Sequence, residues 1–236
     1  MPQVNEKDFI EIEYTGKVKD NNLIFDTTEE KIAKDNNLFE EKAEYKPIVI
    51  CVGQGQIIKG LDKALPEKET GKSYTINISP DEAYGRKNAK LIELISTSKF
   101  QKQNIQPIPG LQINIDGMVG IIKTVSGGRT LVDFNHPLAS KELVYDIKIN
   151  KIITDDAEKI SSILKIDMGI EDAGVTVKEK KAAIRISQEI PKEIQEELKK
   201  KIKGLLPYIG EITIQKSEKK QEDLNRSKDT DKTKGG

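Results

Sequence analysis

The chain has 236 residues, of which 36% are hydrophobic and 33% are charged, and it contains no Trp. Lys plus Arg equal Asp plus Glu at 39 each, so no net field favours nucleic acid or an anionic membrane as a partner. No run approaches the ~20 apolar residues of a membrane span, and no basic region followed by an apolar stretch opens the chain. We therefore expect a cytoplasmic protein of two or three small modules.

The single cysteine and the single histidine bear on catalysis and metal binding. Cys51 cannot form an internal disulfide, which agrees with a reducing compartment. A catalytic pair of Cys51 and His136 would need both side chains within hydrogen-bond reach. The plainer interpretation is that Cys51 is a small buried residue of a strand and His136 a turn residue. Because no His or Cys cluster has ligand spacing, we expect no metal and no cofactor.

The first 86 residues alternate short strands with one short helix. Ile10, Ile12 and Tyr14 alternate with polar residues, as in a half-buried strand. Strands around one short helix indicate an antiparallel α+β unit. The other elements predicted here are strands at 23–25, 48–52 and 74–78 and a helix over 57–64.

A polar stretch, residues 27–46, interrupts this pattern. Thr27 is followed three positions later by Glu30, which is the spacing of a capping box. The spacing predicts a short surface helix that carries Ile32, Leu38 and Phe39. We interpret the stretch as an insertion over a strand edge.

The pattern changes again over residues 87–133, which we predict to form a small, mainly β insert. Asp116-Gly117 and Gly127-Gly128 are short turns of the type that joins antiparallel strands. Residues 143–149 then resume alternation in a strand too long to belong to these hairpins, so 134–153 should return to the first sheet. The elements predicted inside the insert are a helix around 91–100 and strands at 111–115, 118–125 and 130–134.

Residues 155–216 are predicted to form a small α/β domain. Pro191 suits the first turn of its second helix, along which Ile194, Leu198 and Ile202 recur at helical spacing. The remaining predicted elements are a helix over 157–165 and strands at 175–177, 182–186 and 211–214. Residues 217–236 contain one large apolar residue, Leu224, and are predicted to be a disordered tail.

Four segments, in this order and spacing, resemble the FKBP-type peptidyl-prolyl cis-trans isomerases. They are Tyr14, Phe25-Asp26, Gly53 to Leu61, and Ser79 to Gly85. The resemblance spans residues 8–86 and 134–153, and we assign residues 1–86 and 134–153 to the isomerase domain. The insert lies where SlyD-type and archaeal long-type members carry a domain that binds unfolded chains, and the C-terminal domain resembles one linked to dimerisation in the archaeal type. The chain lacks the His/Cys-rich tail of SlyD-type proteins, so nickel or zinc binding is not expected.

The resemblance implies an apolar pocket that isomerises X-Pro bonds without a covalent intermediate. Tyr14, Asp26 and Tyr84 would be the catalytic residues, and Leu61 would lie beneath the proline ring. Taken singly, these residues also fit an ordinary core, a sheet aromatic or a turn acceptor; their joint placement favours the pocket. Leu61 stands where many members have Trp, so macrolide binding is not expected. The implied substrate-binding residues are Phe25, Ile48, Ile57, Ile58, Leu61, Leu138 and Tyr145.

The insert offers more apolar residues than so small a module buries, which predicts an exposed apolar surface for unfolded polypeptide. Alternatively, these residues fill the insert's own core. For the whole chain, the alternative function is a non-catalytic adaptor that keeps the FKBP fold. The predicted partners are unfolded or proline-containing polypeptides and a second copy of the chain. The residues predicted for the chaperone surface are Phe100, Ile105, Ile108, Leu111, Met118 and Val119.

Overall fold

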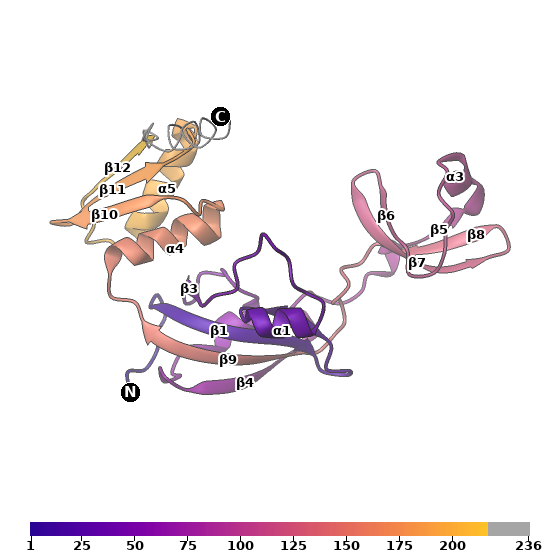
Figure 1. The fold of residues 1–236 in the computed structure, drawn as a ribbon, viewed down its shortest axis with the longest axis horizontal. Coiled ribbons are helices and arrows are strands. Elements are labelled where there is room, and N and C mark those ends of the chain that lie inside the picture. Colours follow the sequence, from indigo (N-terminus) through magenta and orange to yellow (C-terminus); the bar gives the residue numbers. More distant parts are fainter. Residues whose placement is uncertain (217–236) are drawn as a thin grey trace, which may run out of the picture.

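A computed structural model describes residues 1–216, which form three sheets (Figure 1). The predicted tail, residues 217–236, lies outside the described residues. Most strand pairs are antiparallel, and one pair in the C-terminal sheet is parallel. The prediction of an α+β chain with antiparallel sheets is confirmed at this level.

The largest sheet has five strands in the order β2-β1-β9-β4, with β3 paired to β1. Its first and last strands in sequence, β1 (Phe9–Val18) and β9 (Leu143–Ile152), pair over their whole length, so the chain returns to this sheet after residue 134. The other strands are β2 (Ile24–Thr27), β3 (Ile48–Cys51) and β4 (Ser73–Ile78).

A short helix, α2 (Lys59–Ala64), packs on this sheet and closes its core. Leu61 and Leu65 are fully buried, as the helical spacing predicts, and meet Ile10 and Ile12 of β1 in one apolar cluster. The helix thereby fixes the position of Leu61 against the sheet.

The predicted capping box is wrong, although a helix forms nearby. Thr27 is the last residue of β2, and its hydroxyl bonds to that of Thr15 at 2.8 Å and donates to the Tyr14 carbonyl at 3.2 Å. The helix α1 (Glu30–Asp35) begins after Glu29 without a side-chain cap, and it ends before Leu38 and Phe39. The Thr27 hydroxyl accepts from the Glu29 amide at 3.1 Å, but Glu29 precedes the first helical residue, so this bond closes a turn before α1 rather than capping its first turn.

Residues 92–133 form a second sheet of four strands, in the order β5-β8-β7-β6. Both predicted turns are confirmed: Asp116, Gly117, Gly127 and Gly128 all have positive φ, as the two-residue turns of twisted hairpins require. The elements are β5 (Ile92–Ser96), α3 (Thr97–Lys102), β6 (Gln112–Ile115), β7 (Met118–Ser126) and β8 (Arg129–Asp133).

The helix predicted around 91–100 is wrong over most of its length. Residues 92–96 are an edge strand paired with β8, and α3 begins only at Thr97. Leu91, Ile92, Leu94 and Ile95, with Glu93 between them, fit either structure locally. Strand β8 supplies the backbone partners that decide for a strand.

The third sheet belongs to the C-terminal residues. β10 (Gly174–Lys178) and β11 (Lys181–Ile186) form a hairpin, and β12 (Glu211–Lys216) pairs parallel to β11. Two helices, α4 (Asp156–Met168) and α5 (Lys192–Leu205), pack in its core. Pro191 is the residue before α5 rather than part of its first turn.

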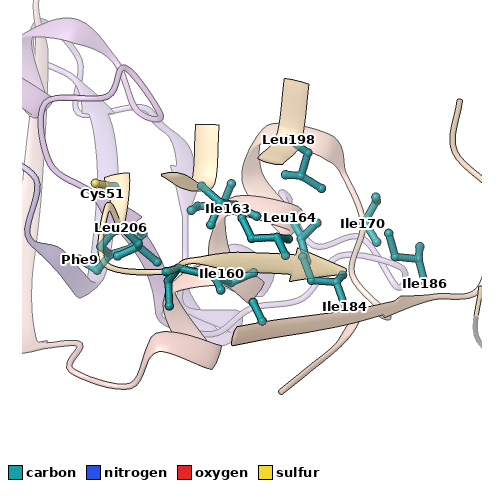
Figure 2. Packing of buried hydrophobic residues seen from close by; sticks show 14 of the residues in the cluster. Phe9, Cys51, Ile160, Ile163, Leu164, Ile170, Ile184, Ile186, Leu198 and Leu206 are labelled. Carbon is teal, nitrogen blue, oxygen red and sulfur yellow. The ribbon is translucent and has the colours of Figure 1, made fainter. Parts of the chain in front are cut away.

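The C-terminal core continues into the five-stranded sheet (Figure 2). Phe9 of β1 and Cys51 of β3 lie in the same buried cluster as Ile160, Ile163 and Leu206. Residues 9 and 10 are both buried, so this end of β1 is covered on both faces and the expected half-buried strand holds only further along. None of the helices within residues 1–216 is long and apolar enough to cross a membrane.

Candidate functional site

A hollow of about 430 Å³ opens between α2, the sheet and the loops that flank them. Its size falls within the usual range of small-ligand pockets. Phe25 and Leu138 pack against the same core but do not line the hollow. The sequence-predicted residues that line it are Tyr14, Asp26, Ile48, Ile57, Ile58, Leu61, Tyr84 and Tyr145.

One side of the hollow is the loop that leads into α2. Gly53 and Gly55 both have positive φ, which glycine adopts without a Cβ clash. The buried Asp62 carboxylate accepts hydrogen bonds from both glycine amides, at 2.8 and 2.9 Å. The loop is thus held by its own helix, and it presents Ile57 and Ile58 to the hollow.

The amide of Ile58 is available to a ligand. Ile58 is the residue before α2, and its carbonyl accepts from Leu61 and Asp62. Within residues 1–216, no carbonyl or side chain accepts a hydrogen bond from its N–H. A backbone donor at the rim of an apolar hollow is suited to a peptide carbonyl.

Tyr14 and Asp26 form the polar contact of the opposite wall. The Tyr14 hydroxyl donates to Asp26 Oδ2 at 2.9 Å. Burial, followed by the charge of Asp26, raises the pKa of Tyr14, so its hydroxyl stays protonated and remains a donor at neutral pH. Asp26 is exposed, so this carboxylate faces both Tyr14 and solvent.

Tyr145 is the aromatic centre of the site. Its ring lies 5.7 Å from that of Tyr14 and meets Phe25 edge-on at 5.8 Å, between ring centroids. The position of Gly16 makes room for this packing, because a Cβ there would lie 2.9 Å from Phe25 and 3.0 Å from Tyr145. Burial raises the pKa of Tyr145, which keeps its hydroxyl protonated.

Tyr84 is the third tyrosine that lines the hollow, and its ring stacks on that of His136. The two rings stack with centroids 4.1 Å apart and planes inclined by 5°. His136 Nδ1 also accepts from the Leu138 amide at 3.2 Å, so the histidine is a turn residue, as predicted, that in addition holds Tyr84. Burial, more than the charge of Asp26, raises the pKa of Tyr84.

Two residues of the hollow were missed by the sequence analysis as site residues, Gln56 and Ile166. The Gln56 carboxamide accepts from the Cys51 amide at 2.7 Å and donates to Asp167 Oδ2 at 3.1 Å. Ile166 comes from α4 of the C-terminal domain. No local pattern could have indicated Ile166, because its place depends on how α4 docks.

Cys51 is buried in β3, as predicted, and lies among apolar side chains. Burial, followed by nearby carboxylates, raises the pKa of its thiol to about 12. A thiol that stays protonated is a poor nucleophile. Residues 1–216 contain no group of three His, Cys, Asp or Glu side chains arranged to hold a metal.

The residues predicted for the chaperone surface differ in how far they are exposed on the insert. Ile108, Met118 and Val119 are exposed, at 54, 46 and 51%. Phe100 is only 3% exposed and lies in the insert's core, so the prediction of a surface role for it is wrong: α3 folds it against the sheet. Ile105 and Leu111 are half-buried against that core. Three exposed residues at the start of the insert were not predicted for this surface: Leu91, Ile92 and Leu94.

The chain is similar to several known proteins and to one domain family. The model of the FKBP26 IF domain matches residues 93–138. A short-type peptidyl-prolyl cis-trans isomerase of Methanocaldococcus jannaschii is 31% identical over 155 residues, which cover 66% of this chain and 98% of the relative. SlyD of Haemophilus influenzae is 25% identical over 54% of this chain and 69% of the relative. An FKBP-type 16 kDa isomerase of Escherichia coli is 31% identical over 45% and 74%.

These relatives are all named as peptidyl-prolyl cis-trans isomerases, which sets the class of the chain. The chain belongs to the FKBP-type peptidyl-prolyl cis-trans isomerases. The predicted likeness to SlyD-type members is confirmed, and the family match over residues 93–138 falls on the second sheet.

Proposed function

We propose that the chain isomerises X-Pro bonds of polypeptides in the hollow lined by Tyr14, Asp26, Leu61 and Tyr84. The single observation that carries this proposal is their convergence on one hollow of about 430 Å³, lined by Ile and Leu side chains together with three Tyr and Asp26. We place the activity in the cytoplasm, since the lone Cys51 gives no internal disulfide.

The chemistry needs no nucleophile. Rotation about the X-Pro bond faces a barrier of ~18–20 kcal/mol, held up by amide resonance. A twisted amide has lost that resonance and its carbonyl is less polar. A site that binds the twisted form better than either planar form lowers the barrier, and an apolar, water-poor hollow has this preference.

Each residue then has a role. Leu61 supports the proline ring from below, while Tyr14 and Tyr145 wall it in. The Ile58 amide and the Tyr84 hydroxyl bind the carbonyls that flank the bond, and Asp26 orients Tyr14 and polarises the imide region. Phe25 and Leu138 do not contact the substrate; they pack against the core beneath the hollow, where Phe25 holds Tyr145 in place.

The test is a protease-free assay of peptide isomerisation. The parent chain should accelerate isomerisation, and Tyr84→Phe and Asp26→Ala should each lower kcat/KM by about 5–10-fold, the loss of roughly one hydrogen bond in the transition state. Tyr45→Phe is the matched control, since the Tyr45 hydroxyl bonds only to the backbone of residues 38 and 40, away from the hollow. A parent chain without turnover would favour the non-catalytic adaptor.

We also propose that the insert, residues 87–133, is a chaperone module beside an isomerase domain of 1–86 and 134–153. Within residues 1–216, six of the ten exposed large apolar residues fall in this segment, which supports a surface for unfolded chains. The triple variant Ile108→Ser, Met118→Ser, Val119→Ser should lose most suppression of aggregation. Leu23→Ser, equally exposed but outside the insert, is the control; equal losses in both would refute this division of labour.

We further propose that residues 155–216 form a domain through which two copies associate. Its sheet ends in two edge strands, β10 and β12, which offer unpaired backbone groups. Light scattering on the full chain should give twice the mass of one chain, and a monomer at micromolar concentration would refute it.

A further inference from the structure

A second hollow, of about 270 Å³, adjoins the first. It lies between β3 of the five-stranded sheet and α4 of the C-terminal domain. Ile48 and Ile166 line both hollows, so they form a ridge with one hollow on each side. Pro47 and Val49 extend the apolar floor of the second hollow.

The charged residues around the second hollow are already paired with one another. Glu44 lies 2.6 Å from both Lys46 and Lys165, and Lys151 lies 3.9 Å from Glu158. The hydroxyl of Ser161 donates to a carbonyl of its own helix at 2.8 Å. Since these groups have partners, the hollow does not call for a charged ligand, and its apolar floor suits an apolar side chain.

The wall contributed by the C-terminal domain is fixed in place. Asp167, next to Ile166, accepts from Gln56 at 3.1 Å and lies 2.9 Å from Lys201 of α5. The buried cluster that joins Phe9 to α4 holds the same helix from its other side. The second hollow therefore exists before any ligand arrives, which lowers the cost of binding there.

We propose that the second hollow is a subsite for an apolar side chain of the same polypeptide whose proline occupies the first. This inference rests on the proposed function of the first hollow. A chain that leaves the prolyl hollow across the ridge of Ile48 and Ile166 enters the second within a few residues, because an extended chain advances ~3.3–3.6 Å per residue. The C-terminal domain would thus select substrates as well as associate with its copy.

The experiment uses a set of fluorescent peptides with one proline and a single Leu moved through each position on both sides, against a Ser at every other position. Both kcat/KM and Kd are measured for the full-length parent chain, together with a short peptide that ends near the proline. We expect one position, or two adjacent ones, at which Leu improves Kd about 5–10-fold over Ser.

Ser161→Tyr fills the second hollow and should abolish that Leu preference, lowering the ratio of long-peptide to short-peptide affinity by the same factor. Lys203→Tyr adds the same side chain to the exposed face of α5 and should leave the ratio unchanged. If Ser161→Tyr does not fold, Ser161→Lys makes the same test by placing a charge in the hollow.

The outcomes separate the two proposals. Turnover of the short peptide with no preferred Leu position would overturn the subsite and leave the isomerase intact. A Leu preference in Kd that Ser161→Tyr removes would support the subsite even if no peptide were turned over, a result that would sink the proposed catalysis alone. A preference that survives in Ser161→Tyr would place it elsewhere and overturn the subsite.

Discussion

The insert and the C-terminal domain join the five-stranded sheet in opposite ways. The insert's core is made only of residues between 95 and 134 among those described, and its connection to the sheet is polar. The apolar core of the C-terminal domain takes in Phe9 and Cys51 of the sheet (Figure 2), while the sheet keeps a second core with α2. Figure 1 shows the same contrast, with the second sheet standing apart and α4 lying close to β3.

A small hydrogen-bonded network, which we call the neck, links the two segments that connect the insert to the sheet. It consists of Lys87, Asn88, Asp133 and Asn135. Asp133 accepts from Lys87 at 2.7 Å and from the Asn135 side chain at 2.8 Å. Asn135 in turn bonds to both backbone groups of Asn88. Hydrogen bonds have directions, so such a neck fixes the orientation of a module without merging its core with that of its neighbour.

This difference predicts which parts unfold together. We call the cluster that joins Phe9 and Cys51 to the apolar residues of the C-terminal domain the merged core. It makes the sheet and the C-terminal domain one cooperative unit, whereas the insert is a separate one. The hollow lies within the merged unit, because Ile166 belongs to it.

The largest effect is expected from Phe9→Ala. Phe9 is 2% exposed in the merged core, so truncation should cost about 3–5 kcal/mol of unfolding free energy. Thermal unfolding followed by tyrosine fluorescence should shift down on the order of 10 °C in one transition. The probe suits the question, since all six Tyr lie outside residues 87–133.

Phe100→Ala is the matched control. Phe100 is equally buried, at 3%, but in the insert's own core, so the variant should lose a similar free energy there and leave the tyrosine transition in place. If Phe100→Ala moves the tyrosine transition as far as Phe9→Ala does, the contrast between the two attachments is wrong.

A smaller effect is expected at the neck. Burial acts to raise the pKa of Asp133, but hydrogen bonds from Lys87 and Asn135 outweigh it and hold the pKa at about 2. A pKa below its unfolded value means that the ionised carboxylate stabilises the fold above about pH 4, and that this contribution disappears as pH falls through 2. The difference between the unfolded pKa of 3.8 and the folded pKa of about 2 corresponds to about 2 kcal/mol of unfolding free energy.

Asp133→Asn should therefore cost about 1–3 kcal/mol of insert stability at neutral pH and remove its dependence on acid. Hydrogen exchange of the amides in β7 and β8 measures this local unfolding. Asp116→Asn, which removes a charge from the tip of the β6–β7 turn instead, should change neither. Unaltered exchange in Asp133→Asn would show that the neck network does not stabilise the insert.

The features that could be predicted from the sequence are those that depend on short segments of the chain. Tyr14, Leu61 and Tyr84 were implied by the resemblance of short segments to the FKBP-type isomerases. The two hairpin turns were predicted because positive φ favours Asp and Gly. Segment 92–96 was assigned to a helix because a run of apolar residues fits both periods until a neighbouring strand decides. Burial of Phe9 and the presence of Ile166 in the hollow depend on the docking of α4, which no local pattern records.

The smallest effect is expected from Gln56→Glu, which tests whether the docked α4 matters to the hollow. The new carboxylate keeps the acceptor for the Cys51 amide but replaces the donor that lies 3.1 Å from Asp167, so two negative charges meet. We expect a loss of about 1 kcal/mol, of which 1 M salt should remove a part, since both side chains are partly buried and partly buried charges are screened less than exposed ones. Gln56→Met removes the same hydrogen bond without adding a charge, and the stability that it loses should not respond to salt.

Because Gln56 and Ile166 line the same hollow, Gln56→Glu should also raise KM for a proline peptide more than it lowers kcat. Equal salt responses in the two variants would mean that Asp167 does not face residue 56 in solution, and the C-terminal wall of the site would then lose its anchor.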